Sequence, residues 1–287
     1  MPSAPSLSVS ERLFFRARGG CADGVVPRMI SQYRVWGEVP SGFTKLVDAS
    51  GCRLIVHDDQ KHVLSAHSWN NSRTGGESSG LHGRGQLRRV KLPNGEVALL
   101  RRYHHGGAFR RLTGGVFFTW PPRPFRELLI TEELRRRGVP TVEVYGACVE
   151  RVWGPFYRGW LATRLIPGAQ DLWAALQSGL IRDAGEERCL RAVAASVRAL
   201  HRQGVYHDDL NLKNILLCSE NRGVSAYIID FDKAKMVLGG LPPHLAKKNL
   251  ARLLRSARKL DPGRRYMSVA LWDAFVNFYY QSDGVEI

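Results

Sequence analysis

Three polar side chains stand at a spacing that could support phosphoryl transfer. Residues 207–214 read H-D-D-L-N-L-K-N, and residues 229–232 read I-D-F-D. Phosphoryl transfer uses one carboxylate to orient and deprotonate an acceptor hydroxyl, and an amide plus a second carboxylate to hold Mg²⁺ against a triphosphate. We assign these roles to Asp209, Asn214 and Asp230, respectively. The alternative is ordinary turn chemistry, since Asp and Asn are frequent in turns.

The elements predicted around this loop favour a functional site over a turn. The apolar run 227–229 predicts a buried strand that ends at Asp230, and residues 215–217 predict its hairpin partner. Ahead of the loop, apolar residues recur at helical spacing between Leu190 and Leu200, and Gly204 ends that helix. Together with H-x-D-L-x-x-x-N and I-D-F, this order matches the protein-kinase motifs H-R-D-L-x-x-x-N and D-F-G.

Candidates for nucleotide binding stand earlier in the chain. Gly83 and Gly85 precede Val90 at the spacing of the kinase glycine loop, in which backbone N–H groups approach phosphate oxygens closely. Arg88 replaces the third glycine of that motif. The structural alternative for this segment is a plain surface turn.

The cation expected to anchor the phosphates is an arginine. Residues 93–95 (P-N-G) predict a hairpin turn, and residues 97–101 predict the next strand, in the register of the kinase V-A-I-K strand. Arg101 stands at the lysine position, and its guanidinium can hold two phosphate oxygens at once. Lys91 on the preceding strand is the other candidate cation. A surface arginine at the edge of a strand is the alternative for Arg101.

A helical glutamate completes the expected phosphate-binding set. Pro122 introduces a predicted helix that runs through Leu134, with Glu127 in its first turn. In a kinase such a glutamate pairs with the strand cation, and an acid in the first turn also complements the helix dipole. Residues 160–166 then predict a strand that leads to a break at 167–169, the expected hinge between two lobes.

We therefore predict an α+β fold of bilobal, protein-kinase-like form, with an antiparallel sheet plus one helix in the N-lobe and a mainly helical C-lobe. The predicted divisions are a variable N-terminal extension at 1–35, the N-lobe at 36–166 and the C-lobe at 167–287. After Asp232 the chain leads directly into a basic amphipathic helix at 245–260, without an A-P-E motif. This leaves little room for the activation loop with which protein kinases bind peptides, so a small molecule or a glycolipid is the predicted acceptor.

Composition and charge narrow the function classes. The chain has 287 residues, 44% of them hydrophobic, but no apolar run long enough for a transmembrane helix. Five scattered cysteines indicate neither a disulfide framework nor a zinc site, and the N-terminus lacks a secretory signal, which predicts a cytoplasmic location. A net charge of +16 favours a polyanion: ATP, a phosphorylated acceptor, an anionic membrane surface or nucleic acid. Nucleic acid is disfavoured, because no aromatic stacking platform is interleaved with basic residues.

At these positions the sequence resembles the lipopolysaccharide core kinases, chiefly the branch of 3-deoxy-D-manno-octulosonic acid (Kdo) kinases. The resemblance spans roughly residues 80–260 and leaves out the first 70 residues. The matching segments are L-L-R-R-Y-H-H-G-G at 99–107, R-P-F-R-E at 123–127, residues 207–216, I-D-F-D-K-A at 229–234 and N-L-A-R-L-L-R-S at 249–256.

The resemblance implies a kinase that uses ATP with Mg²⁺ to phosphorylate a sugar hydroxyl of the lipopolysaccharide inner core, here Kdo linked to lipid A. It implies that Asp209 is the base, that Asn214 and Asp230 hold the metal, and that Glu127 is the helical acid. It places Arg101 at the cation position, where heptose kinases tend to carry lysine. The implied partners are an anionic glycolipid acceptor and, by peripheral contact, the cytoplasmic face of the inner membrane of a Gram-negative bacterium.

Other functions stay open at this point. They are a heptose kinase of the same family, a small-molecule phosphotransferase of the aminoglycoside or choline kinase type, a minimal protein kinase and a pseudokinase scaffold. Basic side chains could bind the anionic acceptor or the membrane, with a solvated basic face as the alternative. These side chains are Arg110, Arg111, Lys247, Lys248, Arg252, Arg255, Arg258 and Lys259.

Overall fold

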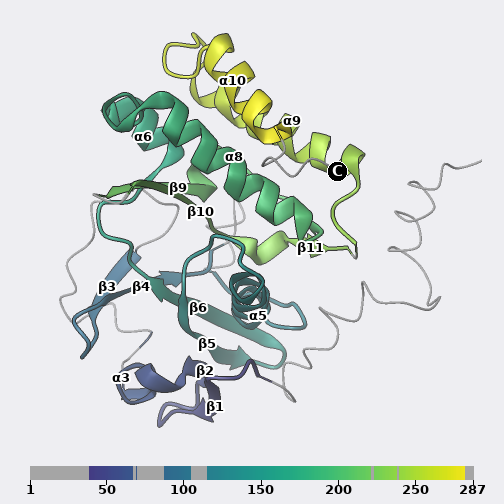
Figure 1. The fold of residues 1–287 in the computed structure, drawn as a ribbon. Coiled ribbons are helices and arrows are strands. Elements are labelled where there is room, and N and C mark those ends of the chain that lie inside the picture. Colours follow the sequence, from purple (N-terminus) through teal and green to yellow (C-terminus); the bar gives the residue numbers. More distant parts are fainter. Residues whose placement is uncertain are drawn as a thin grey trace, which may run out of the picture.

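A six-stranded antiparallel sheet forms the first part of the molecule, and helices dominate the second part (Figure 1). The structure is a computed structural model, and it describes residues 39–66, 69, 87–104, 115–220, 223–237 and 239–281. The strands of the large sheet are β1 (Phe43–Val47), β2 (Arg53–His57), β3 (Leu87–Lys91), β4 (Val97–Arg102), β5 (Val144–Trp153) and β6 (Phe156–Arg164). Their order across the sheet is β1-β2-β5-β6-β4-β3.

Both faces of this sheet are apolar, because successive side chains of a strand point to opposite faces. In β2, Ile55 joins the core under α5 (Arg123–Arg136), while Leu54 joins a second core on the other face. That second core includes Leu64 of α3 (Lys61–Ala66), which follows the 3₁₀ turn η1 (Asp58–Gln60). Helix α5 is also buried on its far side, where Ile130 and Leu134 join the core of the second part. It therefore lies between the sheet and the helical part (Figure 1).

The helical part packs against a small sheet that carries the polar loop. Strands β10 (Gly223–Ile228), β9 (Ile215–Glu220) and β7 (Gln170–Asp171) form this sheet, and β8 (Val205–Tyr206) pairs with β11 (Lys235–Met236). Helix α8 packs against β10 and against α10. The helices are α6 (Leu172–Ser178), α7 (Leu180–Ala184), α8 (Glu186–Arg202), α9 (Pro243–Leu260) and α10 (Val269–Tyr280), and the 3₁₀ turns are η2 (Leu212–Asn214) and η3 (Phe231–Lys233).

The predicted α+β fold, with an N-terminal antiparallel sheet, one helix against it and a mainly helical C-terminal part, is confirmed. The helical pattern between Leu190 and Leu200 lies within α8, and the predicted hairpin is β9–β10, with Ile215 paired to Ile228. The P-N-G turn joins β3 to β4. Only residues 234–242 separate η3 from α9, so a long activation loop is absent from this place.

Gly204 fixes how α8 leads into the polar loop. Its φ is +72°, and a Cβ added there would lie 1.9 Å from the carbonyl oxygen of Val237. The N–H of Val237 donates to the Gly204 carbonyl oxygen at 2.7 Å, which explains the close approach. Only glycine combines this φ with this contact, so the turn delivers the chain to His207 in a fixed register.

Among the described residues, no helix combines the length and the apolar composition that a bilayer span requires. Four cysteines lie in the described part, and all four are buried with free thiols: Cys52, Cys148, Cys189 and Cys218.

Candidate active site

The loop between β8 and β9 holds Asp209 and Asn214 in a fixed relation. The side-chain amide of Asn214 donates to the Asp209 carbonyl oxygen at 2.8 Å, and the amide of Asn211 donates to the same oxygen at 2.8 Å. The Asp209 side chain is half-buried, and its carboxylate makes no hydrogen bond or ion pair within the described part of the chain. The backbone of Asp209 is therefore held while its carboxylate remains available to accept a proton.

His207 links this loop to the strand that ends at Asp230. Its Nδ1 accepts from the N–H of Asp209 at 3.2 Å, which leaves Nε2 to carry the proton and donate to the Ile229 carbonyl oxygen at 3.0 Å. Burial lowers the pKa of His207, against the opposing charges of Asp230 and Asp209. A lowered pKa favours the neutral imidazole, and its two hydrogen bonds position the loop.

Helix α9 supports the loop from one face. Asn249, which is fully buried, accepts the N–H of His207 at 3.1 Å through Oδ1 and donates to the His207 carbonyl oxygen at 2.8 Å through Nδ2. Arg252 pairs with Asp208 at 2.9 Å. Ser256 Oγ accepts the first N–H of η2 at 3.2 Å. The N-L-A-R-L-L-R-S segment is therefore the platform of the polar loop, since side chains three to four residues apart share a helix face.

The β9–β10 hairpin brings Asp230 next to Asn214. Beyond the last paired strand residues, the N–H of Ile229 donates to the Asn214 carbonyl oxygen at 3.0 Å. Asp230 follows with a φ of +70°, a left-handed conformation that costs a non-glycine residue about 1–2 kcal/mol. Such strain is concentrated at functional sites, where surrounding contacts hold it in place.

Arg101 connects the large sheet, α5 and the I-D-F-D segment. Its Nη2 donates to both carboxylate oxygens of Glu127 at 2.6 and 2.7 Å, and its Nη1 donates to Asp230 Oδ1 at 3.0 Å. The guanidinium carbon lies 5.0 Å from the centre of the Tyr103 ring, and the Tyr103 hydroxyl donates to Glu127. Arg101 is therefore no surface arginine at a strand edge. It forms the strand–helix ion pair that the sequence pattern predicts for Arg101 and Glu127.

The two carboxyl groups held by Arg101 have shifted pKa values of opposite sign. Burial raises the pKa of Glu127 to about 7, against the charge of Arg101, and only 2% of this residue is exposed. Burial also acts to raise the pKa of Asp230, but the charge and hydrogen bond of Arg101 outweigh it and leave that pKa below its ordinary value. At neutral pH Asp230 is therefore ionised and able to bind a cation, whereas Glu127 titrates near pH 7.

The strand register separates the two candidate cations. Arg101 lies opposite Leu87, and Lys91 lies opposite Val97. Four residues of an extended strand thus place Lys91 about 13 Å along the ladder from the Arg101 position. Lys91 is exposed, so the geometry favours Arg101. The predicted glycines Gly83 and Gly85 lie outside the described residues.

The predicted place of Glu127 in the first turn of its helix is wrong. Helix α5 begins at Arg123, and its first turn contains no acidic residue. Proline is tolerated in a first turn because its missing N–H would have no helical partner there, so the helix starts ahead of Pro124. Glu127 consequently lies in the second turn, where it pairs with Arg101 and does not cap the helix dipole.

A second ion-pair network, which we did not predict, fastens the start of α5 to Asp232. Both Nε and Nη2 of Arg123 donate to the Asp232 carboxylate, the former at 2.9 Å. Arg126 donates to the Asp232 carbonyl oxygen. The sequence signal for this network is an aspartate where D-F-G has glycine, together with two arginines in R-P-F-R-E, one turn apart on the helix.

The donor atoms near Asp230 fit a hard divalent cation. Because Nδ2 of Asn214 donates to the loop backbone, Oδ1 is the atom left to bind a ligand, and Oδ2 of Asp230 accepts no hydrogen bond within the described residues. Mg²⁺ prefers such oxygen ligands and completes its shell with phosphate oxygens and water. No group of three or more His, Cys, Asp or Glu side chains suited to a metal occurs among the described residues.

The basic side chains predicted to bind an anion differ in their surroundings. Arg252 is engaged by Asp208, and Arg110 and Arg111 lie outside the described residues. The others on α9 are exposed: Lys247, Lys248, Arg255, Arg258 and Lys259.

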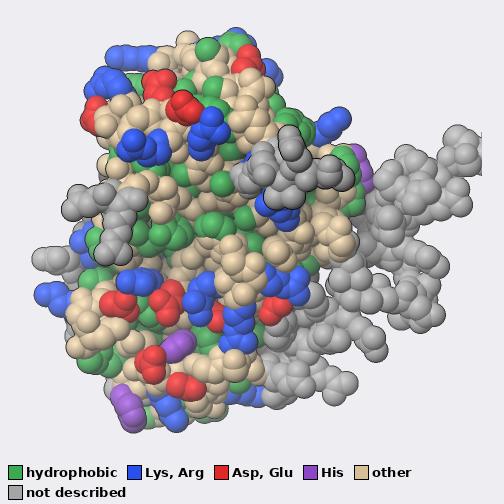
Figure 2. Space-filling model, in the orientation of Figure 1, with side chains coloured by type: hydrophobic (Ala, Val, Ile, Leu, Met, Phe, Trp, Pro, Cys, Tyr) green, Lys and Arg blue, Asp and Glu red, His purple; other side chains and the backbone are tan. Residues whose placement is uncertain are grey.

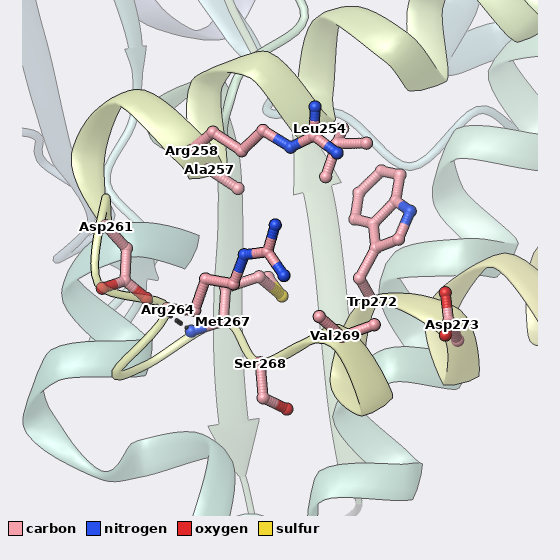
Figure 3. A pocket seen from close by; sticks show the side chains of 10 residues that line it. All are labelled: Leu254, Ala257, Arg258, Asp261, Arg264, Met267, Ser268, Val269, Trp272 and Asp273. Carbon is pink, nitrogen blue, oxygen red and sulfur yellow. Dashed lines mark hydrogen bonds between the residues drawn. The ribbon is translucent and has the colours of Figure 1, made fainter.

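A pocket of about 290 Å³ lies between α9 and α10 (Figure 3). The pocket contains none of the residues assigned above to catalysis, ATP binding or metal binding. It does contain Arg258, one of the exposed basic residues of α9. The lining residues are Leu254, Ala257, Arg258, Asp261, Arg264, Met267, Ser268, Val269, Trp272 and Asp273.

The chain is similar to proteins of known family. The sequence profile described as "Lipopolysaccharide kinase (Kdo/WaaP) family" matches residues 74–279. The 3-deoxy-D-manno-octulosonic acid kinase of Pasteurella multocida (strain Pm70) is 35% identical over 168 residues, 58% of this chain and 67% of the relative. The enzyme of the same name from Vibrio cholerae serotype O1 is 31% identical over 208 residues, 71% of this chain and 83% of the relative. A solved structure described as "WaaP in complex with acyl carrier protein" aligns with a TM-score of 0.49 and 17% identity, over 80% of this chain and 89% of that chain.

Proposed function

Because the chain belongs to the lipopolysaccharide kinase (Kdo/WaaP) family, we propose that it transfers the γ-phosphoryl group of ATP to a hydroxyl of Kdo linked to lipid A. The observation that carries the proposal is the Asp209 carboxylate, which has no partner within the described residues while Asn214 and Asn211 hold its backbone. A carboxylate in this state can orient an acceptor hydroxyl and take its proton.

In the proposed reaction the acceptor oxygen attacks the γ-phosphorus and its proton passes to Asp209. ADP leaves with the electron pair of the broken P–O bond. Arg101, oriented by Glu127, offsets the charge of the phosphates from the strand side. Mg²⁺, held through Asn214 and Asp230, would supply further neutralisation of the phosphate oxygens. The glycines Gly83 and Gly85 would cover the phosphates from the N-lobe.

The proposed acceptor determines the proposed location of the protein in the cell. Kdo–lipid A is an anionic glycolipid, so we propose that the protein meets it by peripheral contact with the cytoplasmic face of the inner membrane. Helix α9 adjoins the loop that carries Asp209, because Asn249 and Arg252 contact that loop. Its exposed side chains include Lys247, Arg255 and Lys259. Its charges suit the carboxylates and phosphates of such an acceptor. We further propose that ATP binds between lobes formed by residues 36–166 and 167–287.

Purified full-length protein incubated with ATP, Mg²⁺ and lipid A precursors tests the proposal. Precursors that bear Kdo alone, and precursors that bear Kdo with heptose, are compared by mass spectrometry. We expect one phosphate to be added to the Kdo-bearing precursor, and the Asp209→Asn variant to form this product about 10²–10⁴-fold more slowly. Phosphorylation that requires heptose would instead assign the heptose-kinase activity, and phosphate on protein or on neither glycolipid would overturn the proposal.

A further inference from the structure

Aromatic side chains are exposed together at the tip of the β5–β6 hairpin and on the segment ahead of α5. Trp153 is 65% exposed and Phe118 is 67% exposed. The Phe156 ring joins them, with its centroid 4.5 Å from that of Trp153 and 5.6 Å from that of Phe118. Trp120, two residues beyond Phe118, is 70% exposed. We call Phe118, Trp153 and Phe156 the aromatic patch.

The strand geometry makes this exposure unusual. Phe117 pairs with Tyr157 in an antiparallel bridge, with hydrogen bonds of 2.7 and 3.0 Å in the two directions. Phe117 and Tyr157 point inward and are 2% and 5% exposed, so their neighbours Phe118 and Phe156 point outward. Outward positions beside water are normally polar. Contiguous exposed apolar side chains of this kind mark an interaction surface.

The charge around the patch indicates what the surface meets. Residues 115–122 and 152–157 contain no charged side chain. At the rim, Arg151 donates to the Gly154 carbonyl oxygen at 2.8 Å and has no acidic partner within the described residues. The neighbouring acid, Glu150, is paired with Arg158. Aromatic rings beside an arginine such as Arg151 suit the boundary between the headgroups and the acyl chains of an anionic bilayer.

The same segment leads directly to the candidate active site. Tyr157 holds it, because the Tyr157 hydroxyl contacts Thr119 Oγ1 at 2.5 Å and accepts the N–H of Arg123 at 2.9 Å. Arg123 in turn binds Asp232. The aromatic patch is therefore linked through Tyr157 and Arg123 to Asp232, in the segment that carries Asp230.

We propose that the aromatic patch inserts into the interfacial zone of an anionic phospholipid bilayer and so docks the kinase on the membrane that carries its acceptor. The bilayer-binding part of this statement stands on the patch alone, and the part about the acceptor rests on the proposed function. The docking energy comes from apolar area removed from water, and Arg151 adds attraction to anionic headgroups.

Flotation of the full-length protein with vesicles of phosphatidylethanolamine and phosphatidylglycerol tests the docking. The variant with Phe118→Ser, Trp153→Ser and Phe156→Ser should bind these vesicles about tenfold or more weakly than the wild type, given the apolar area lost. The control variant carries Val47→Ser and Tyr280→Ser, two exposed apolar residues outside the patch, and should bind as the wild type does. Equal binding by all three proteins would overturn the proposal, and so would a wild-type dimer that only the patch variant dissociates.

A second variant keeps the test independent of folding. Trp153→Phe preserves the apolar surface, so vesicle binding should be unchanged. Quenching of tryptophan fluorescence by brominated lipids should fall, because one inserted indole is gone. Undiminished quenching would show that Trp153 does not enter the bilayer.

Two acceptors separate the docking from the catalytic proposal. On Kdo–lipid A in vesicles, the patch variant should turn over about tenfold more slowly than the wild type, in proportion to its lost binding. On a deacylated, water-soluble acceptor, the two proteins should be equally active. Absence of activity on both acceptors, with vesicle binding intact, would reject the proposed function and leave the docking surface supported.

Discussion

Asp209 combines a held backbone with a carboxylate that has no partner within the described residues, so a change confined to the carboxylate is informative. Asparagine keeps the size of the side chain and removes the ability to take a proton. We expect Asp209→Asn to lower turnover by about 10²–10⁴-fold, the usual contribution of a general base. ATP binding and the melting temperature should be unchanged, because the hydrogen bonds of Asn214 and Asn211 go to the backbone of residue 209. Phosphate transfer and nucleotide titration measure the two effects, and unimpaired transfer would contradict the assigned base.

The raised pKa of Glu127 predicts that the free energy of unfolding depends on pH, and burial of the carboxyl group gives the sign of this dependence. Its pKa is raised from 4.5 to about 7 in the folded protein. Between these two pH values the folded chain retains a proton on Glu127 that the unfolded chain releases. The resulting contribution to the free energy of unfolding is full below pH 4.5 and is lost as the pH rises through 7.

Glutamine removes this titration while keeping the shape of the side chain. The free energy of unfolding of the wild type minus that of Glu127→Gln should therefore be larger at pH 5 than at pH 8, by up to about 3 kcal/mol. Urea unfolding at the two pH values measures the difference, and titrating groups that do not interact with Glu127 cancel between the proteins. A difference that is constant or larger at pH 8 would reject the raised pKa.

Among the elements, those specified by local patterns are predictable from the sequence. The apolar spacing of Leu190 to Leu200 predicts α8, and the apolar runs around the polar loop predict β9 and β10. The ion pair of Arg101 and Glu127 could be predicted only because the sequence has a V-A-I-K-like strand followed by the start of a helix. The contacts of Arg123 with Asp232 and of Asn249 with His207 join residues far apart in sequence. No local periodicity encodes such tertiary pairings, which is why they were not predicted.

The ion pair between α5 and Asp232 is expected to position the segment that carries Asp230. Arg123→Ala leaves the Asp232 carboxylate, which is 7% exposed as a side chain, with only Arg126 at 3.5 Å. Loss of one partner from a buried pair is strongly destabilising, and the remaining arginine limits the expected loss to about 1–3 kcal/mol. Because the change reaches the site through α5, the KM for ATP should rise, whereas a merely structural role would lower the melting temperature alone.

Arg137→Ala is the matched control for this variant. Arg137 pairs with Glu133 at the other end of α5, in a more exposed setting, where such pairs contribute about 0.2–1 kcal/mol. Its KM for ATP should match that of the wild type. If Arg123→Ala and Arg137→Ala had the same KM for ATP, the pair with Asp232 would have no role in positioning the site.

At the scale of the whole molecule, the net charge is +16, and on the face drawn in Figure 2 basic side chains lie over both parts, with acidic side chains among them. The sequence predicts this excess but cannot tell engaged arginines from available ones. In the structure Arg101, Arg123 and Arg252 neutralise buried or half-buried aspartates and glutamates. The basic residues left exposed on α9 are therefore the better candidates for binding an anionic acceptor.

The exposed face of α9 gives a prediction that a charge-matched control can isolate. The combined changes Lys247→Gln, Arg255→Gln and Lys259→Gln should raise the KM for a deacylated, water-soluble acceptor about tenfold, as long-range attraction to an anion is lost. The same number of charges is removed elsewhere by Lys45→Gln, Lys61→Gln and Arg188→Gln, and that variant should keep the wild-type KM. The KM for ATP should change in neither variant.

Raising the ionic strength screens exposed charges, so the difference in acceptor KM between the two variants should decrease in high salt. An equal rise in both variants would mean that net charge, not α9, attracts the acceptor.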